Sequence, residues 1–133
     1  MADTVTSQTI QDGGKTAVLK FTNESDGSGE SSVKKVDVSA LAADSAGNAC
    51  TSVSIARIYW ACRGMGVDIE FDASTNVLAI PLPADSTGDE YYDLFGSIPN
   101  NAGSGVTGDI DFTTVSASNG DAYSIILVLH KNY

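Results

Sequence analysis

The sequence has few of the residues from which catalytic and metal centres are usually built. Its 133 residues include one histidine, one tryptophan and two cysteines. His130 has no evident orienting partner or nucleophile motif, so we expect it to be a surface residue and not a general base. One histidine and two cysteines also fall short of a structural zinc set. We therefore predict no catalytic residue, no metal site and no cofactor, and we expect a protein that is not an enzyme.

Basic residues are also scarce. Lysine and arginine number 7 against 17 acidic residues, which gives a formal net charge of −10. Phosphate backbones and anionic membranes bind basic faces, so we expect neither nucleic acid nor a membrane as a partner. No segment reaches the ~20 apolar residues of a membrane span, and the first residues lack the basic and apolar regions of a signal peptide.

The two cysteines are expected to be reduced, because the chain is expected to be made in the cytoplasm. A strand over Val53–Cys62 would hold Cys50 and Cys62 farther apart than the ~7 Å limit for a disulfide. We therefore expect both to pack as small apolar groups.

Proline is rare at 3 residues, whereas 13 glycines favour short strands joined by tight turns. The stretch Val53–Phe71 is the centre of this pattern. Its first half is β-branched and aromatic, and its second half alternates apolar and acidic residues from Val67 to Asp72. Because Gly64 and Gly66 lie between the halves, the stretch predicts a central hairpin.

The remaining elements follow from the same reasoning. Ala122–Lys131 carries apolar residues on both faces and is expected to be a central strand buried on both sides, after a hairpin turn at Asn119-Gly120-Asp121. Ser39 is expected to cap one helical turn, and Ala84–Glu90 is expected to be a loop. Residues 1–12 are expected to form an N-terminal arm or an edge strand. Further strands are expected at Lys15–Asn23, Ser32–Val38, Val77–Leu82 and Asp109–Ser116.

These elements predict one all-β domain over residues 1–133. Seven to nine short strands at spacings of roughly 8–12 residues, with at most one short helical turn, are typical of an antiparallel β-sandwich or jelly roll. No internal repeat or linker divides the chain.

Several groups of carboxylates could in principle hold Ca²⁺. An alternating strand produces a row of acidic side chains on its solvent face without any metal, and we favour that interpretation. The groups are Asp68, Glu70 and Asp72; Asp26 and Glu30; Asp109 and Asp111; and Asp85, Asp89, Glu90 and Asp93.

Arginine and tyrosine are the side chains that suggest contacts. Arg57 interrupts an apolar strand, so it lies either on the solvent face or at an interface, where its planar fork binds carboxylates. Four aromatic residues close the ends of the sandwich or form a binding patch: Tyr91, Tyr92, Phe95 and Tyr133.

Several stretches resemble small virion structural proteins of tailed phages, especially marine and cyanobacterial phages. They are Met1–Thr9, Phe21–Glu30, Val36–Leu41, Ile58–Ala73, Asn100–Asp109 and Gly120–Ile125, which together span nearly the whole chain.

The resemblance implies a virion location and a role in capsid decoration (a cement protein). The partners it implies are the major capsid protein and other copies of the chain, arranged as a homotrimer or another homo-oligomer. We expect the N-terminal arm and the Gly96–Gly108 loop to make the inter-subunit contacts. The candidate interface residues are Thr4, Val5, Thr6, Arg57, Arg63, Tyr91, Tyr92, Asn100 and Asn101.

Two alternatives belong to other classes of protein. A tail or head-fibre adhesion module would bind host-surface glycan through Trp60, Tyr91 and Tyr92. A glycan-degrading β-sandwich would need a cleft with two facing carboxylates.

Overall fold

The computed structural model describes residues 3–93 and 96–133. These residues form nine β-strands, and a 3-10 turn follows the third of them. No helix among them is long and apolar enough to cross a membrane. The strands are β1 (Thr4–Asp12), β2 (Thr16–Asp26), β3 (Val33–Val36), β4 (Ser52–Arg63), β5 (Gly66–Phe71), β6 (Val77–Leu82), β7 (Thr87–Tyr91), β8 (Ile110–Val115) and β9 (Asn119–Asn132), and the 3-10 turn is η1 (Val38–Ala40).

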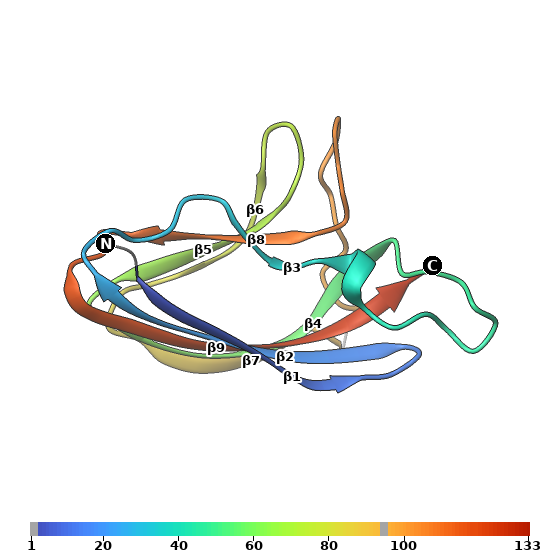
Figure 1. Ribbon diagram of the computed structural model, residues 1–133, viewed down its shortest axis with the longest axis horizontal. Coiled ribbons are helices and arrows are strands. Elements are labelled where there is room, and N and C mark those ends of the chain that lie inside the picture. Colours follow the sequence, from blue (N-terminus) through green and yellow to red (C-terminus); the bar gives the residue numbers. More distant parts are fainter. Residues whose placement is uncertain (1–2, 94–95) are drawn as a thin grey trace.

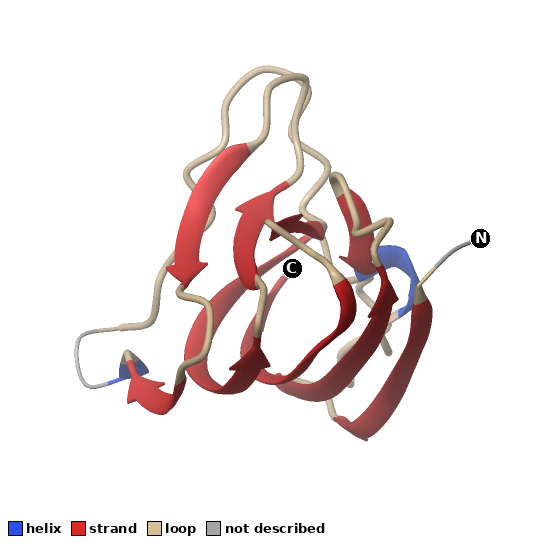
Figure 2. Ribbon diagram, turned by 90° about the vertical axis from the view of Figure 1, so that its left-hand side faces the viewer, coloured by secondary structure: helices blue, strands red, loops and turns tan. Residues whose placement is uncertain are grey.

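The strands form two antiparallel sheets. Sheet A has the order β1-β2-β9-β4-β7, and sheet B has the order β3-β8-β5-β6. The sheets stack face to face, with sheet A below sheet B in Figure 1. Figure 2, turned by 90°, shows the strands curving around the interior between them. The predicted all-β sandwich with one short helical turn is confirmed.

The core is built by strict alternation along the central strands. On β9, Tyr123, Ile125, Leu127 and Leu129 are all buried, and each such side chain contributes about 1.5–3 kcal/mol through burial. The position of β9 between β2 and β4 confirms a central strand. Its other face is only half-buried, so the predicted burial on both sides is wrong. The reason is that a two-layer sandwich covers only one face of each sheet.

The predicted central hairpin is also wrong. β4 pairs with β9 and β7 in sheet A, whereas β5 pairs with β8 and β6 in sheet B. Gly64 adopts a φ of 82°, and the chain then crosses between the sheets with the Met65 side chain fully buried. A turn that contains glycine can connect strands of two different sheets as well as the two strands of a hairpin. Each strand gains two pairing partners while the apolar faces meet across the interior.

Three other predictions need correction. Asn119-Gly120-Asp121 is no hairpin turn, because β8 and β9 belong to different sheets. The predicted loop Ala84–Glu90 contains most of β7, which pairs with β4. Asp37 caps η1 instead of Ser39, whose N–H donates to the Asp37 carboxylate at 3.0 Å. Of the two alternatives predicted for the N-terminal residues, an arm or an edge strand, residues 4–12 form the edge strand.

Buried polar clamps hold the two ends of β9. Near its end, the Lys131 ammonium is fully buried and donates to the Asp12 carboxylate, to Gly13 O at 2.6 Å and to Ala42 O at 3.0 Å. Toward its start, Tyr123 Oη donates to Glu30 Oε1 at 2.6 Å. These contacts tie β9 to three loops and fix the frame on which the outer face of sheet A is displayed.

Candidate functional site

The outer face of sheet A spans five paired strands, one more than sheet B. One row of side chains crosses all five strands on the side turned away from sheet B, and we call this surface the platform. The row consists of Gln8, Lys20, Ile126, Tyr59 and Asp89. A parallel row contains Val18, Val128, Arg57 and Tyr91.

A β-bulge determines which side chains of β4 reach the platform. The register shifts between Ile55 and Arg57, so Ala56 is an extra residue in the strand. Val53 and Ile55 before the bulge and Ile58 after it are all fully buried. The bulge therefore changes the parity of the strand and turns Arg57 outward.

Four side chains at the β4–β7 border form what we call the tyrosine–arginine patch: Arg57, Tyr59, Tyr91 and Asp93. Arg57 Nε donates to Asp93 Oδ2 at 3.0 Å, and the guanidinium carbon lies 4.6 Å from the Tyr91 ring centroid. The two tyrosine rings meet edge to face at 6.1 Å, and their hydroxyl oxygens are 3.3 Å apart. Tyr91 is 44% exposed. The patch is thus ordered by its own contacts while it remains open to a partner.

Electrostatic effects stabilise the charged and protonated forms within the patch. The hydrogen bond to Asp93, followed by contact with Tyr59, raises the pKa of the Arg57 guanidinium. The hydrogen bond with Tyr59 raises the pKa of Tyr91. Tyr91 therefore stays neutral and Arg57 stays charged near pH 7, and the patch offers hydroxyl groups and one cation beside aromatic rings.

Trp60 and Tyr92, predicted to bind glycan, do not join the patch. Trp60 points to the inner side of β4, where its indole N–H donates to Ser86 Oγ at 3.0 Å and its ring covers Gly88. Tyr92 is half-buried and packs against the core. Phe95 lies outside the described residues. Tyr59 takes their place in the patch, and sequence reasoning missed it because the bulge reverses its orientation.

The other predicted interface residues are scattered. Thr4, Val5 and Thr6 are exposed on β1, at the opposite border of sheet A from the patch. Arg63 ends β4 and donates to Gly120 O at 3.0 Å. Two more lie in the 98–109 connection, where the Asn100 carboxamide oxygen accepts from Ala102 N–H at 2.9 Å and Asn101 is exposed. The structure therefore brings together only Arg57 and Tyr91 of the predicted set.

The carboxylate groups have ordinary structural partners. Asp109 pairs with Lys34 at 3.1 Å, and Glu70 accepts from Thr113 at 2.7 Å. Asp111 lies within hydrogen-bonding reach of Asp72, which is closer than the ~5 Å or more between the carboxyl groups of glycosidases. In the part of the chain that the structure describes, no three His, Cys, Asp or Glu side chains gather as a metal site.

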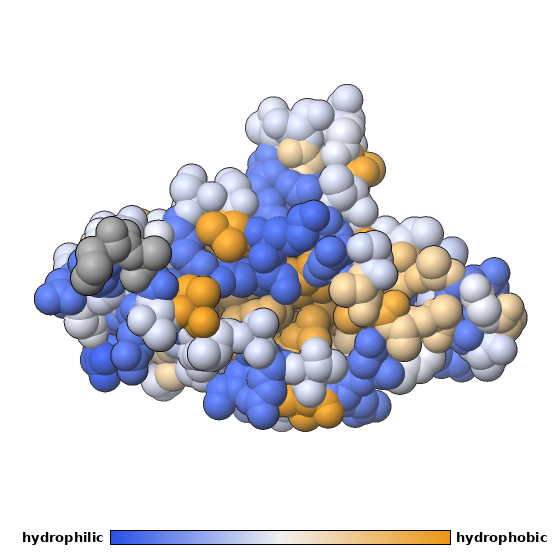
Figure 3. Space-filling view, viewed as in Figure 1, coloured by the Kyte–Doolittle hydropathy of each residue, from blue (hydrophilic) through white to orange (hydrophobic). Residues whose placement is uncertain are grey.

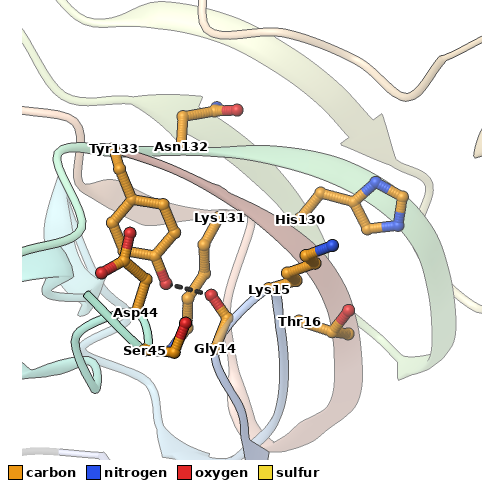
Figure 4. A pocket seen from close by; sticks show the side chains of 9 residues that line it. All are labelled: Gly14, Lys15, Thr16, Asp44, Ser45, His130, Lys131, Asn132 and Tyr133. Carbon is orange, nitrogen blue, oxygen red and sulfur yellow. Dashed lines mark hydrogen bonds between the residues drawn. The ribbon is translucent and has the colours of Figure 1, made fainter. Parts of the chain in front are cut away.

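A recess of about 680 Å³ lies beside the end of β9 (Figure 4). Tyr133 Oη donates to Gly14 O across it, and His130 lies on its rim, exposed as predicted. His130 Nδ1 is 3.3 Å from Ser97 Oγ, but Ser97 is only 5% exposed. A hydroxyl that is buried in this way offers little access for a substrate. Cys50 and Cys62 are free and buried, as expected.

The chain was compared with known proteins in sequence and in structure. No protein-family model matches the chain, and no curated protein matches it in sequence. Among solved structures, the chain is similar to one described as a carbohydrate binding module of family 29. The identity is 11% and the TM-score 0.41, over 96% of this chain and 89% of that chain. A likeness at this level supports no conclusion about the fold, the ligand or the residue roles of this chain.

Proposed function

We propose that the chain is a structural protein of a tailed-phage virion that decorates the capsid by docking the platform onto the major capsid protein. The resemblance in sequence supports the virion setting. The tyrosine–arginine patch is the observation that carries the docking, because tyrosine and arginine are among the residues most enriched at protein-interface hot spots. Its internal contacts pre-order the side chains and so reduce the entropy lost on binding.

Many weak contacts suit this role. Each copy that bound only the assembled shell would stabilise the shell by mass action, and the effect adds over the copies on a particle. The net charge of −10 keeps free copies apart in solution. Because the platform also carries Lys20 and Arg57, it is less acidic than the chain as a whole.

The test uses capsid shells of the phage that encodes the chain, freed of this protein, and measures the rebinding of purified protein. Arg57→Ala and Tyr91→Ala should each weaken binding about tenfold or more, because hot-spot truncations cost more than about 1.4 kcal/mol. Leu78→Ala is the matched control. Leu78 is 50% exposed, similar to Tyr91, but lies in sheet B.

Unchanged rebinding of both patch variants would contradict docking through the platform. A particle reconstruction that places the chain on the tail would contradict the decoration role itself. Truncating residues 1–10 would not test docking separately from folding, because β1 pairs with β2 along nearly its whole length. That deletion would strip an edge strand and destabilise the domain.

The second candidate function is a glycan-binding module on a tail or head fibre. The specific observation in its favour is the pair of tyrosines on an open sheet face, beside Arg57 and Asp89. Aromatic rings offer apolar faces to a sugar ring, and the flanking charged groups can hydrogen-bond to its hydroxyls. Binding of the chain to glycans on an array would support this function if Tyr59→Ala abolished the binding. An array on which the chain binds no glycan would count against it.

A further inference from the structure

The four outer edges of the two sheets differ in how they are protected. An exposed edge strand carries unpaired N–H and C=O groups, and natural proteins block such edges with short strands, charged residues, proline or bulges. Three edges here carry these devices. β3 has only 4 residues, two of them Lys34 and Lys35. β6 contains Pro81, and β7 has 5 residues that include Asp89 and Glu90.

β1 is the exception. It is 9 residues long, and every residue from Thr4 to Gln11 is exposed. The stretch contains no charged residue and no proline. Its one irregularity is the bulge at Ile10, which leaves residues 4–9 in regular register with β2. No described strand pairs with its other side. Figure 3 shows hydrophilic residues over much of this side of the molecule, with apolar residues gathered toward its centre and right.

We propose that β1 pairs antiparallel with β1 of a second copy of this chain, about a two-fold axis at Ser7. In this register Val5 lies opposite Thr9, Thr6 opposite Gln8, and Asp3 opposite Gln11. No two carboxylates face each other, which matters for two chains that each carry a net charge of −10. Such a pairing is isologous, as closed dimers require.

The pairing joins the two A sheets into one continuous sheet. Because the axis is perpendicular to the sheet, both platforms point in the same direction, and each dimer presents two tyrosine–arginine patches to one surface. A bivalent contact of this kind binds more tightly than either patch alone. The arrangement is two-fold, so of the two expectations from the resemblance it agrees with another homo-oligomer and not with a homotrimer. It depends on the β1 edge alone, so it stands whether or not the chain belongs to a virion.

The experiment measures the mass of the full chain by light scattering and sedimentation over a wide concentration range. The expected result is a concentration-dependent dimer of twice 13.7 kDa. Ser7→Lys places two ammonium groups together on the axis and should raise the dissociation constant about tenfold or more. Circular dichroism checks that this variant keeps its fold.

A cross-link tests the register. Paired Cα atoms in antiparallel strands lie about 4.5–5.5 Å apart, within the range of a disulfide. Ser7→Cys should therefore oxidise to a covalent dimer much faster than Ser118→Cys, which is also exposed but lies between β8 and β9. A chain that stays monomeric at the highest concentration would overturn the proposal. So would an oligomer that is indifferent to Ser7→Lys, or equal cross-linking of the two cysteine variants.

Discussion

Asp111 makes the domain less stable as the pH rises, and replacing it tests this directly. The residue is 3% exposed. Its Oδ2 accepts from Asn76 at 3.0 Å, and its Oδ1 has no donor. Burial, followed by the neighbouring Asp72 carboxyl, raises the pKa of Asp111 from 3.8 to about 6. Thr107 donates to Asp72 at 2.7 Å and lowers the pKa of Asp72, so the shared proton stays on Asp111.

The direction of this pH dependence follows from the number of protons that the folded and unfolded chains bind. Between pH 4 and 6 the folded chain holds a proton on Asp111 that the unfolded chain has released. The contribution of Asp111 to stability is therefore fully present below its unfolded pKa of 3.8 and is lost as the pH rises through about 6. A difference of about 2 pKa units corresponds to about 3 kcal/mol.

Asp111→Asn removes the ionisable group, and with it the loss of stability at high pH, while it keeps the shape of the side chain. Its amide can donate to Asp72, and its oxygen can still accept from Asn76. We expect the variant to be more stable than the native chain at pH 8, by up to about 3 kcal/mol, and to lose the advantage at pH 4. The measurement is urea unfolding at pH 4, 5, 6 and 8 in EDTA. Asp89→Asn, on the exposed strand β7, is the control for loss of one charge. An Asp111→Asn variant that is less stable at pH 8, or that keeps the native pH slope, would refute the reasoning.

Two further predictions concern packing and the clamp at the end of β9. A Cβ on Gly88 would lie 2.7 Å from the Trp60 ring, which Ser86 holds in place, so Gly88→Ala should cost about 1–3 kcal/mol and shift the fluorescence of the only tryptophan. Gly103→Ala, with open space around its Cβ, is the control, and equal stability of the two variants would contradict the packing argument. Asp12→Asn leaves the buried Lys131 ammonium without its countercharge, so it should cost about 3 kcal/mol or more in urea unfolding. Lys131→Met in the Asp12→Asn background should recover part of that loss, and no recovery would show that Asp12 acts mainly through its bonds to the Ala42 N–H.

Local patterns were enough to predict the strands but not their pairing. Alternation in Val67–Phe71 and Tyr123–Leu129 identified the buried faces, because a period of two is a property of one strand alone. Pairing depends on residues far apart in the sequence. The two turns at Gly64 and Gly120 were predicted to be hairpin turns, but each carries the chain from one sheet to the other. β7 was missed because Thr87–Tyr91 is an exposed edge strand with no buried residue.

The candidate site depends on one residue that sequence reasoning passed over. Counting by twos from the buried Val53 and Ile55 would place Arg57 and Tyr59 in the core. The apolar run Ile55-Ala56 followed by a charged residue was the only local sign that the count breaks there. A bulge at Ala56 resolves the conflict, because burying an unpaired guanidinium costs far more than one disrupted pair of strand hydrogen bonds. The tyrosine–arginine patch exists because this correction turns Arg57 and Tyr59 outward together, beside Tyr91 of the neighbouring strand. A function that depends on this patch therefore depends on the bulge. Substitutions at Ala56 test that function as directly as substitutions of the side chains that the bulge turns outward.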